Sequence, residues 1–158
     1  MPNRRRVFAA CLFVAVIGTS AMIVAVVKVK AQIDVSREEC AIANLVKAGA
    51  IVQRCPSSDG TYCFSVSLAS CENCKSNDEL LRYVADIGNV GELGLAPIPL
   101  YEAGRKSLFR LKGLAVLSVY VTDTGIAREA YAELKRQMKL RNPDIYMAAG
   151  DKDGKPVE

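Results

Sequence analysis

Apolar residues recur in this chain at a period of 24 residues, and this recurrence is the strongest constraint on its fold. Two runs hold aliphatic residues at the same relative positions in five of six slots. The runs are Leu81, Val84, Ile87, Val90, Leu93 and Leu95, and then Arg105, Leu108, Leu111, Leu114, Leu117 and Val119. Each run starts with helical spacing and ends in the alternation typical of a strand. A helix that leads into a short strand at a constant period of this length predicts a solenoid of stacked repeats.

The repeated residues resemble the leucine-rich-repeat family, in its short bacterial form with V-T-D-x-G turns. Residues 121–126 (V-T-D-T-G-I) match that turn, and residues 41–45 and 64–68 match the helix and strand that precede the first repeat. The resemblance implies an α/β fold, a short leucine-rich-repeat solenoid with parallel inner strands and outer helices behind a cap made of a helix and a hairpin. The repeats are irregular in length, and Arg105 takes the place of an expected leucine.

The predicted domain organisation consists of an anchor, a body and a tail. The N-terminal part comprises a cytoplasmic segment (1–6), a membrane-spanning signal anchor (7–27) and a linker (28–35). The body (36–147) comprises an N-terminal cap (36–68), the repeats (69–125) and a C-terminal cap (126–147), and a flexible tail (148–158) follows. The first helix of the body is predicted to begin at Ser36, which with Glu39 fits a capping box.

Residues 7–27 contain no charged side chain. A helix of this length, rising ~1.5 Å per residue, would match a hydrocarbon core of ~30 Å. Arg4–Arg6 precede the segment and Lys28 and Lys30 follow it, which favours an N-terminus inside the cell and an extracytoplasmic body. The alternative is a signal peptide cleaved after Ala31, although the apolar run exceeds the ~7–15 residues typical of such peptides. The sequence therefore predicts a single-pass membrane protein.

The distribution of charge argues against a nucleic-acid partner. The formal net charge is +4, but five of the 21 basic residues lie before residue 32, where no acidic residue occurs. The other 16 basic residues are balanced by 17 acidic ones, so the body lacks the basic excess that phosphates require. The chain also contains no histidine, the commonest general base and metal ligand. We therefore expect no catalytic residues, no metal and no cofactor.

The Cys-x-x-Cys motif formed by Cys71 and Cys74 could carry redox chemistry, and it defines the alternative function, a membrane-tethered thiol/disulfide protein. Glu72 would oppose formation of a thiolate beside it. In leucine-rich repeats, moreover, a buried Cys or Asn follows the last strand leucine by three residues, as Cys71 follows Leu68. A structural role for Cys71 is therefore favoured.

Cys55 and Cys63 flank the turn between two predicted strands, so in an oxidising compartment they could form a disulfide. They could also bind zinc together with Cys71 and Cys74. Strong zinc signatures pair two Cys-x-x-Cys clusters, however, and only one occurs here.

The predicted function is non-catalytic contact with a protein partner. In the expected solenoid, the residues between the buried leucines point outward along the concave face. These partner-binding candidates are Ser65, Ser67, Glu92, Gly94, Ser118 and Tyr120. Gly94 and Ser118 lie 24 residues apart, so they are predicted to be neighbours on adjacent strands.

Overall fold

The computed structural model describes residues 27, 28, 30, 32–56, 61–71, 74–122, 126–151, 155 and 156. The chain divides into two compact units, Met1–Arg37 and Glu38–Glu158. In the first unit residues 32–37 are helical, and in the second residues 38–47 are helical and precede the sheet. Because residues 32–35 are already helical, the prediction that the helix begins at Ser36 is wrong.

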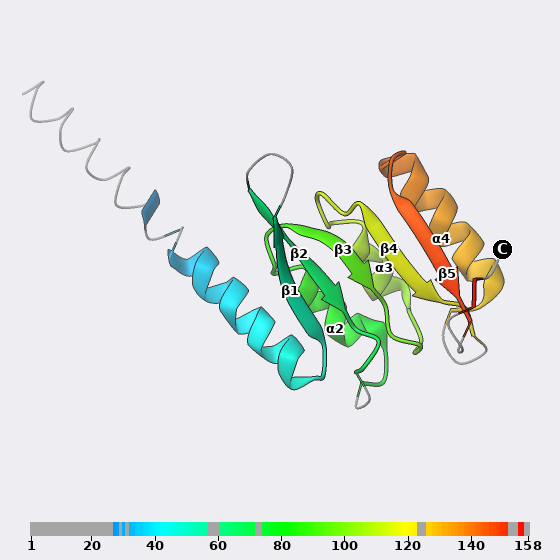
Figure 1. Cartoon of the computed structure of the whole chain (residues 1–158), viewed down its shortest axis with the longest axis horizontal. Helices are drawn as coiled ribbons and strands as arrows, with labels where there is room; N and C mark the ends of the chain where they lie inside the picture. Colours follow the sequence, from blue (N-terminus) through cyan, green and yellow to red (C-terminus); the bar gives the residue numbers. More distant parts are fainter. Residues whose placement is uncertain are drawn as a thin grey trace, which may run out of the picture. The chain divides into compact units, whose positions relative to one another are not determined.

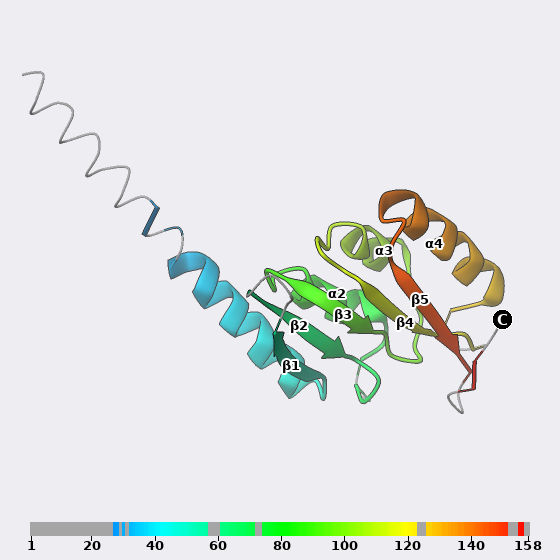
Figure 2. The same ribbon diagram turned by 45° about the horizontal axis from the view of Figure 1, so that its top comes forward.

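Five strands form one mixed sheet in the order β1-β2-β3-β4-β5 (Figure 1). The strands are β1 (Ile51–Pro56), β2 (Tyr62–Ser67), β3 (Val90–Gly94), β4 (Val116–Tyr120) and β5 (Tyr146–Gly150). β1 and β2 are antiparallel, whereas each later strand is parallel to its predecessor. The parallel strands are connected by α2 (Asn77–Val84), α3 (Glu102–Leu108) and α4 (Arg128–Arg141). Figures 1 and 2 show these three helices on one face of the sheet.

The expected leucine-rich-repeat solenoid is wrong. The chain instead forms a single five-stranded mixed sheet that begins with an antiparallel pair. Its connecting helices have 8, 7 and 14 residues, so the successive units are not equivalent. The segments predicted as N-terminal and C-terminal caps contribute β1, β2 and β5 to the same sheet as β3 and β4. The aliphatic period sets the register of one strand pair, but it does not make the flanking connections alike.

Within the described ranges, no helix is both long and apolar enough to cross a membrane. Residues 7–26, which carry most of the predicted anchor, lie outside the described residues. Residues 123–125, which supply most of the V-T-D-x-G turn, lie outside them as well.

The predicted pairing of β3 with β4 is confirmed. Leu93 pairs with Leu117 and Gly94 pairs with Ser118, as the offset of 24 residues requires. β5 continues to Gly150, beyond residue 147, where the sequence placed the end of the body.

The core lies between the sheet and the helices. Buried side chains alternate with half-buried ones along β2 and β4, as expected for a sheet with one covered face. The strands contribute Phe64, Val66, Val90, Leu93, Leu117, Val119 and Met147 to the core, and the helices add Leu80, Leu81, Val84, Leu108, Tyr131, Leu134 and Met138. Ala41 and Leu45, from the helical residues 38–47, belong to the same buried cluster.

The loop that follows β3 is held by two side chains at the start of α2. The amide of the fully buried Asn77 donates to the carbonyls of Ala96 (3.0 Å) and Ile98 (2.7 Å), and its Oδ1 accepts the amide of Ala96 (2.9 Å). Asp78 Oδ1 accepts the amide of Tyr101 at 2.8 Å. These bonds fix the chain between β3 and α3, and so fix where β3 ends.

Candidate binding face

The face of the sheet opposite the helices, called the open face below, carries all six residues predicted to bind a partner. They come from β2, β3 and β4 and alternate with buried core residues. Their side chains are half-buried or exposed. The members are Ser65, Ser67, Glu92, Gly94, Ser118 and Tyr120. The sequence placed them correctly relative to the core because strand periodicity needs only the alternation with leucine and valine.

Register arranges the open face in two rows that cross the strands. One row contains small residues from β2 to β5: Ser67, Gly94, Ser118 and Ala148. The adjacent row contains Ser65 and the longer side chains of Glu92, Val116 and Tyr146. β1 extends the rows with Ile51 opposite Ser67 and Gln53 opposite Ser65. Because neighbouring strands lie ~4.8 Å apart, each row forms a continuous surface.

The open face is nearly neutral. Glu92 is its one charged residue among the described strand positions, and its side chain is exposed. Two apolar side chains are also exposed, Ile51 at 51% and Tyr146 at 65%. Sequence reasoning missed both residues because they lie outside the 24-residue period. The sequence could have indicated Tyr146, because it lies between two apolar residues, Ile145 and Met147, which are both buried.

The Cys-x-x-Cys motif does not have the character of a reactive thiol pair. Cys71 lies in the buried core, and burial, followed by the nearby Cys74, raises its pKa. Burial and the carboxylate of Glu79 raise the pKa of Cys74 as well. Reactive cysteines have lowered pKa values, which keep the thiolate populated near neutral pH. The environment of both thiols therefore opposes nucleophilic chemistry.

A pocket of about 530 Å³ lies on the helical side of the sheet, where α3 and α4 end. It is lined by Leu108, Phe109, Leu111, Lys112, Gly113, Leu114, Met138, Arg141 and Asn142. Arg141 donates to the carbonyl of Phe109 at 3.2 Å, and its guanidinium carbon lies 4.8 Å from the centre of that ring. Asn142 donates to the carbonyl of Leu114 at 2.9 Å. Two polar side chains of the lining thus bond to backbone carbonyls between α3 and β4, and the described lining contains no carboxylate, thiol or hydroxyl.

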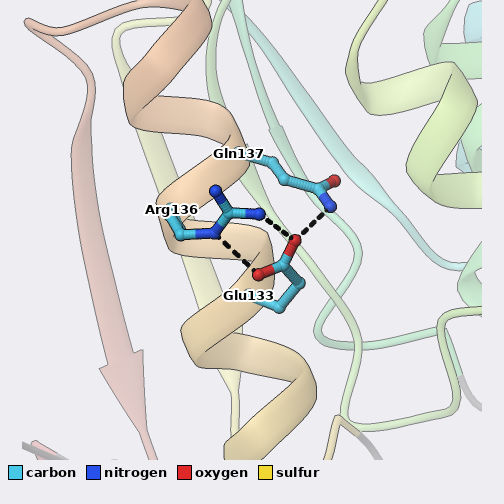
Figure 3. A network of polar contacts seen from close by, with 3 residues as sticks. All are labelled: Glu133, Arg136 and Gln137. Carbon is cyan, nitrogen blue, oxygen red and sulfur yellow. Dashed lines mark hydrogen bonds and ion pairs between the residues drawn. The ribbon is translucent and has the colours of Figure 1, made fainter.

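Charged groups cluster on α4, around Glu133 (Figure 3). Its carboxylate accepts hydrogen bonds from Arg136 Nε (2.8 Å) and Nη2 (2.7 Å) and from the amide of Gln137. The bonds from Arg136 and then Gln137 lower the pKa of Glu133 to about 2. All three residues lie on one helix, so this network stabilises α4 and defines no binding site. Nor do the described residues include a group of three or more Cys, Asp or Glu that could hold a metal ion.

In comparisons with known proteins, no family model, no curated protein and no solved structure matches this chain. No family is therefore assigned to it.

Proposed function

We propose that this protein is a non-catalytic binding module that is attached to a membrane by its N-terminal segment and contacts a protein partner through the open face. The observation that carries this proposal is that α2, α3 and α4 all lie on the other face of the sheet (Figures 1 and 2). Sheets built from parallel strands are ordinarily covered on both faces. Four of the five strands here, β2 to β5, are parallel neighbours. A partner on the open face would supply the missing layer.

The chemistry of the open face favours a protein over a nucleic acid. Phosphates require a basic surface, whereas the charged residue of this face is the acid Glu92. The small side chains in the row from Ser67 to Ala148 allow a flat partner to approach the backbone closely. Tyr120 and Tyr146 supply aromatic side chains of the kind that anchor protein interfaces. The proposed partner is thus a folded protein with a neutral surface and a basic side chain opposite Glu92.

The available side chains support binding rather than catalysis. The chain has no histidine to act as a general base. The pKa values of Cys71 and Cys74 are raised, which disfavours a thiolate nucleophile. The pocket near the ends of α3 and α4 offers Lys112 and Arg141 as its charged groups, with no described acid beside them.

Attachment to a membrane rests on the sequence of residues 7–27, which carry no charge and are flanked by basic residues on both sides. The same charge pattern favours an extracytoplasmic body. The proposed partner would then be another protein at the same membrane or in the adjacent compartment.

Photo-crosslinking in intact cells tests the partner assignment. A benzoylphenylalanine at position 118, on the open face, should yield a discrete adduct with a second protein. The same group at Lys135, an exposed position on α4, should not. Adding Gly94→Arg should abolish the adduct at position 118. An adduct of twice the chain's own mass would identify a second copy as the occupant and overturn the assignment, and so would the absence of any adduct.

Paired substitutions distinguish loss of binding from loss of folding. A Cβ at Gly94 would have Ser67 Oγ as its nearest neighbour at 3.7 Å, an ordinary contact, so arginine fits there. Gly94→Arg with Ser118→Arg should therefore melt near the wild-type temperature and fail to bind. Leu93→Arg with Leu117→Arg places charge in the core and should prevent folding. If both pairs destabilise the fold equally, the open face is not a solvated surface and the proposal fails.

A further inference from the structure

Two cysteines face each other across the antiparallel strands β1 and β2. Cys55 and Cys63 are partners in register, and both are half-buried free thiols. Directly opposite side chains of an antiparallel pair lie on the same face, with Cβ atoms ~4.5–5.5 Å apart. Cys63 alternates with Phe64, which is buried on the helical side, so both thiols lie on the open face. Rotation of the side chains therefore brings the two sulfur atoms toward each other.

The type of pairing determines how relaxed a bond between them can be. The amide of Phe64 donates to the carbonyl of Asn89 at 2.8 Å, so the neighbouring Cys63 directs its own amide and carbonyl toward β1. Cys55 and Cys63 are therefore a hydrogen-bonded pair, in which the Cα atoms lie ~5.5 Å apart. Disulfides accept Cα separations of ~4.4–6.8 Å but require Cβ separations of ~3.5–4.5 Å. The backbone spacing fits, whereas the Cβ atoms must approach slightly, so the bond would be readily reduced.

Gly91 provides the space for the reduced thiol. It is the extra residue of a bulge in β3, and a Cβ built on it would lie 2.9 Å from Cys63 Sγ. The sulfur of Cys63 thus occupies the space above Gly91, on the side of β2 that faces away from Cys55. Forming a bond with Cys55 requires the Cys63 side chain to turn away from Gly91.

We propose that Cys55 and Cys63 form a redox-modification site, at which a disulfide donor joins β1 covalently to β2. One cysteine thiolate attacks the donor's disulfide, forms a mixed disulfide and releases one donor thiol. The other cysteine then displaces the second donor thiol and closes the bond. The two cysteines lose two protons and two electrons, and the donor disulfide is reduced to two thiols. Because both thiols are partly exposed, a small donor such as glutathione disulfide can reach them.

The bond would link β1, an edge strand of the sheet, covalently to β2. A covalent link between neighbouring strands stabilises the fold chiefly by restricting the unfolded chain. A zinc site at the same position lacks support, because no group of three or more candidate ligands occurs among the described residues. In the purified protein, formation of the disulfide does not require the partner proposed for the open face.

Mapping of disulfides in the full-length protein tests the proposal. The protein is equilibrated with mixtures of reduced and oxidised glutathione, its free thiols are alkylated under denaturing conditions, and its peptides are analysed by mass spectrometry. A peptide containing Cys55 should be joined to one containing Cys63, and dithiothreitol should release both. Cys40→Ser should leave this link intact, whereas Cys55→Ser should leave Cys63 alkylated or glutathionylated. The proposal is overturned if both cysteines remain separately modified in the wild type, or if Cys63 pairs with Cys71 or Cys74.

Two glycine variants on β3 test the geometry. Gly91→Ala should displace the reduced thiol of Cys63 and so favour the oxidised state. The ratio of the squared concentration of reduced glutathione to the concentration of oxidised glutathione, at which half of the protein is oxidised, should rise by about threefold. Gly94→Ala is the matched control, because its Cβ would make only ordinary contacts and lies away from Cys63. Equal midpoints for Gly91→Ala and the wild type would mean that Cys63 does not have to leave Gly91 for the bond to form, and would overturn the proposed movement.

Discussion

At the scale of single residues, Asn77 has a specific structural role. Its side chain is fully buried and bonds to the amide of Ala96 and to the carbonyls of Ala96 and Ile98. Buried polar groups that lose their partners cost more free energy than a typical hydrogen bond contributes. Asn77→Ala should therefore lower the free energy of unfolding by about 2–4 kcal/mol in urea titrations.

Asn44 offers a matched control for that experiment. Its amide donates to the carbonyl of Cys40 four residues earlier, at an exposed site on the helix. Water can replace this bond, so Asn44→Ala should change stability by less than about 0.5 kcal/mol. Similar losses for the Asn44 and Asn77 variants would show that burial does not determine the cost at Asn77.

Glu133 makes stability depend on pH in the acid range. Its pKa falls from the ordinary value of 4.5 to about 2 because Arg136 and Gln137 bond to the carboxylate. A lowered pKa in the folded state contributes stability above pH 4.5, which is lost as the pH falls toward 2. Glu133→Gln should remove this contribution, so its urea midpoint should fall less steeply than that of the wild type in this window. Because the Glu133 side chain is 41% exposed, salt should reduce the difference.

Glu129→Gln makes the same chemical change elsewhere on α4 and serves as the control for the pH experiment. If the Glu129 and Glu133 variants follow the same pH profile, the network around Glu133 does not contribute to acid stability.

At the scale of elements, burial differs along the leucines of the second apolar run. Leu117 on β4 is fully buried, whereas Leu111, in the turn before that strand, is only half-buried. Leu117→Ala should therefore destabilise the fold by ~2–5 kcal/mol, the cost of a large cavity. Leu111→Ala should cost clearly less, because solvent already reaches its side chain. Chemical denaturation of the two variants measures the difference, and the reverse order would contradict the position of β4.

The sequence predicted the strands better than the arrangement of the units. Leu93 and Leu117 carry strand alternation at a fixed offset, and this periodicity is enough to predict that β3 and β4 pair in register. The same period suggested equivalent repeats, which the structure does not have. The units differ in the connections between strands and helices. The geometry of these connections depends on side-chain contacts that the periodicity does not encode, such as the bonds between buried Asn77 and Ala96.

At the scale of the whole molecule, the predicted binding residues were incomplete at both edges of the sheet. The residues of β2, β3 and β4 could be assigned to one face because each alternates with a buried aliphatic residue. Ile51 on β1 and Tyr146 on β5 were missed because both strands fall outside the 24-residue period. Which strands lie next to each other depends on tertiary packing, so the extent of the open face could be established only from the structure.

Membrane attachment is the remaining prediction for the whole molecule, and it depends on the sequence of residues 7–27. These residues carry no charge, and Lys28 and Lys30 follow them directly. Moving so apolar a segment into water is unfavourable, and its length suits a hydrocarbon core of ~30 Å. The protein should therefore stay in the membrane fraction after alkaline carbonate washing, and N-terminal sequencing should find Met1 or Pro2. A variant lacking residues 7–27 should move to the supernatant. Recovery of the wild type as a soluble chain that begins at Gln32 would show that the segment is removed as a signal peptide.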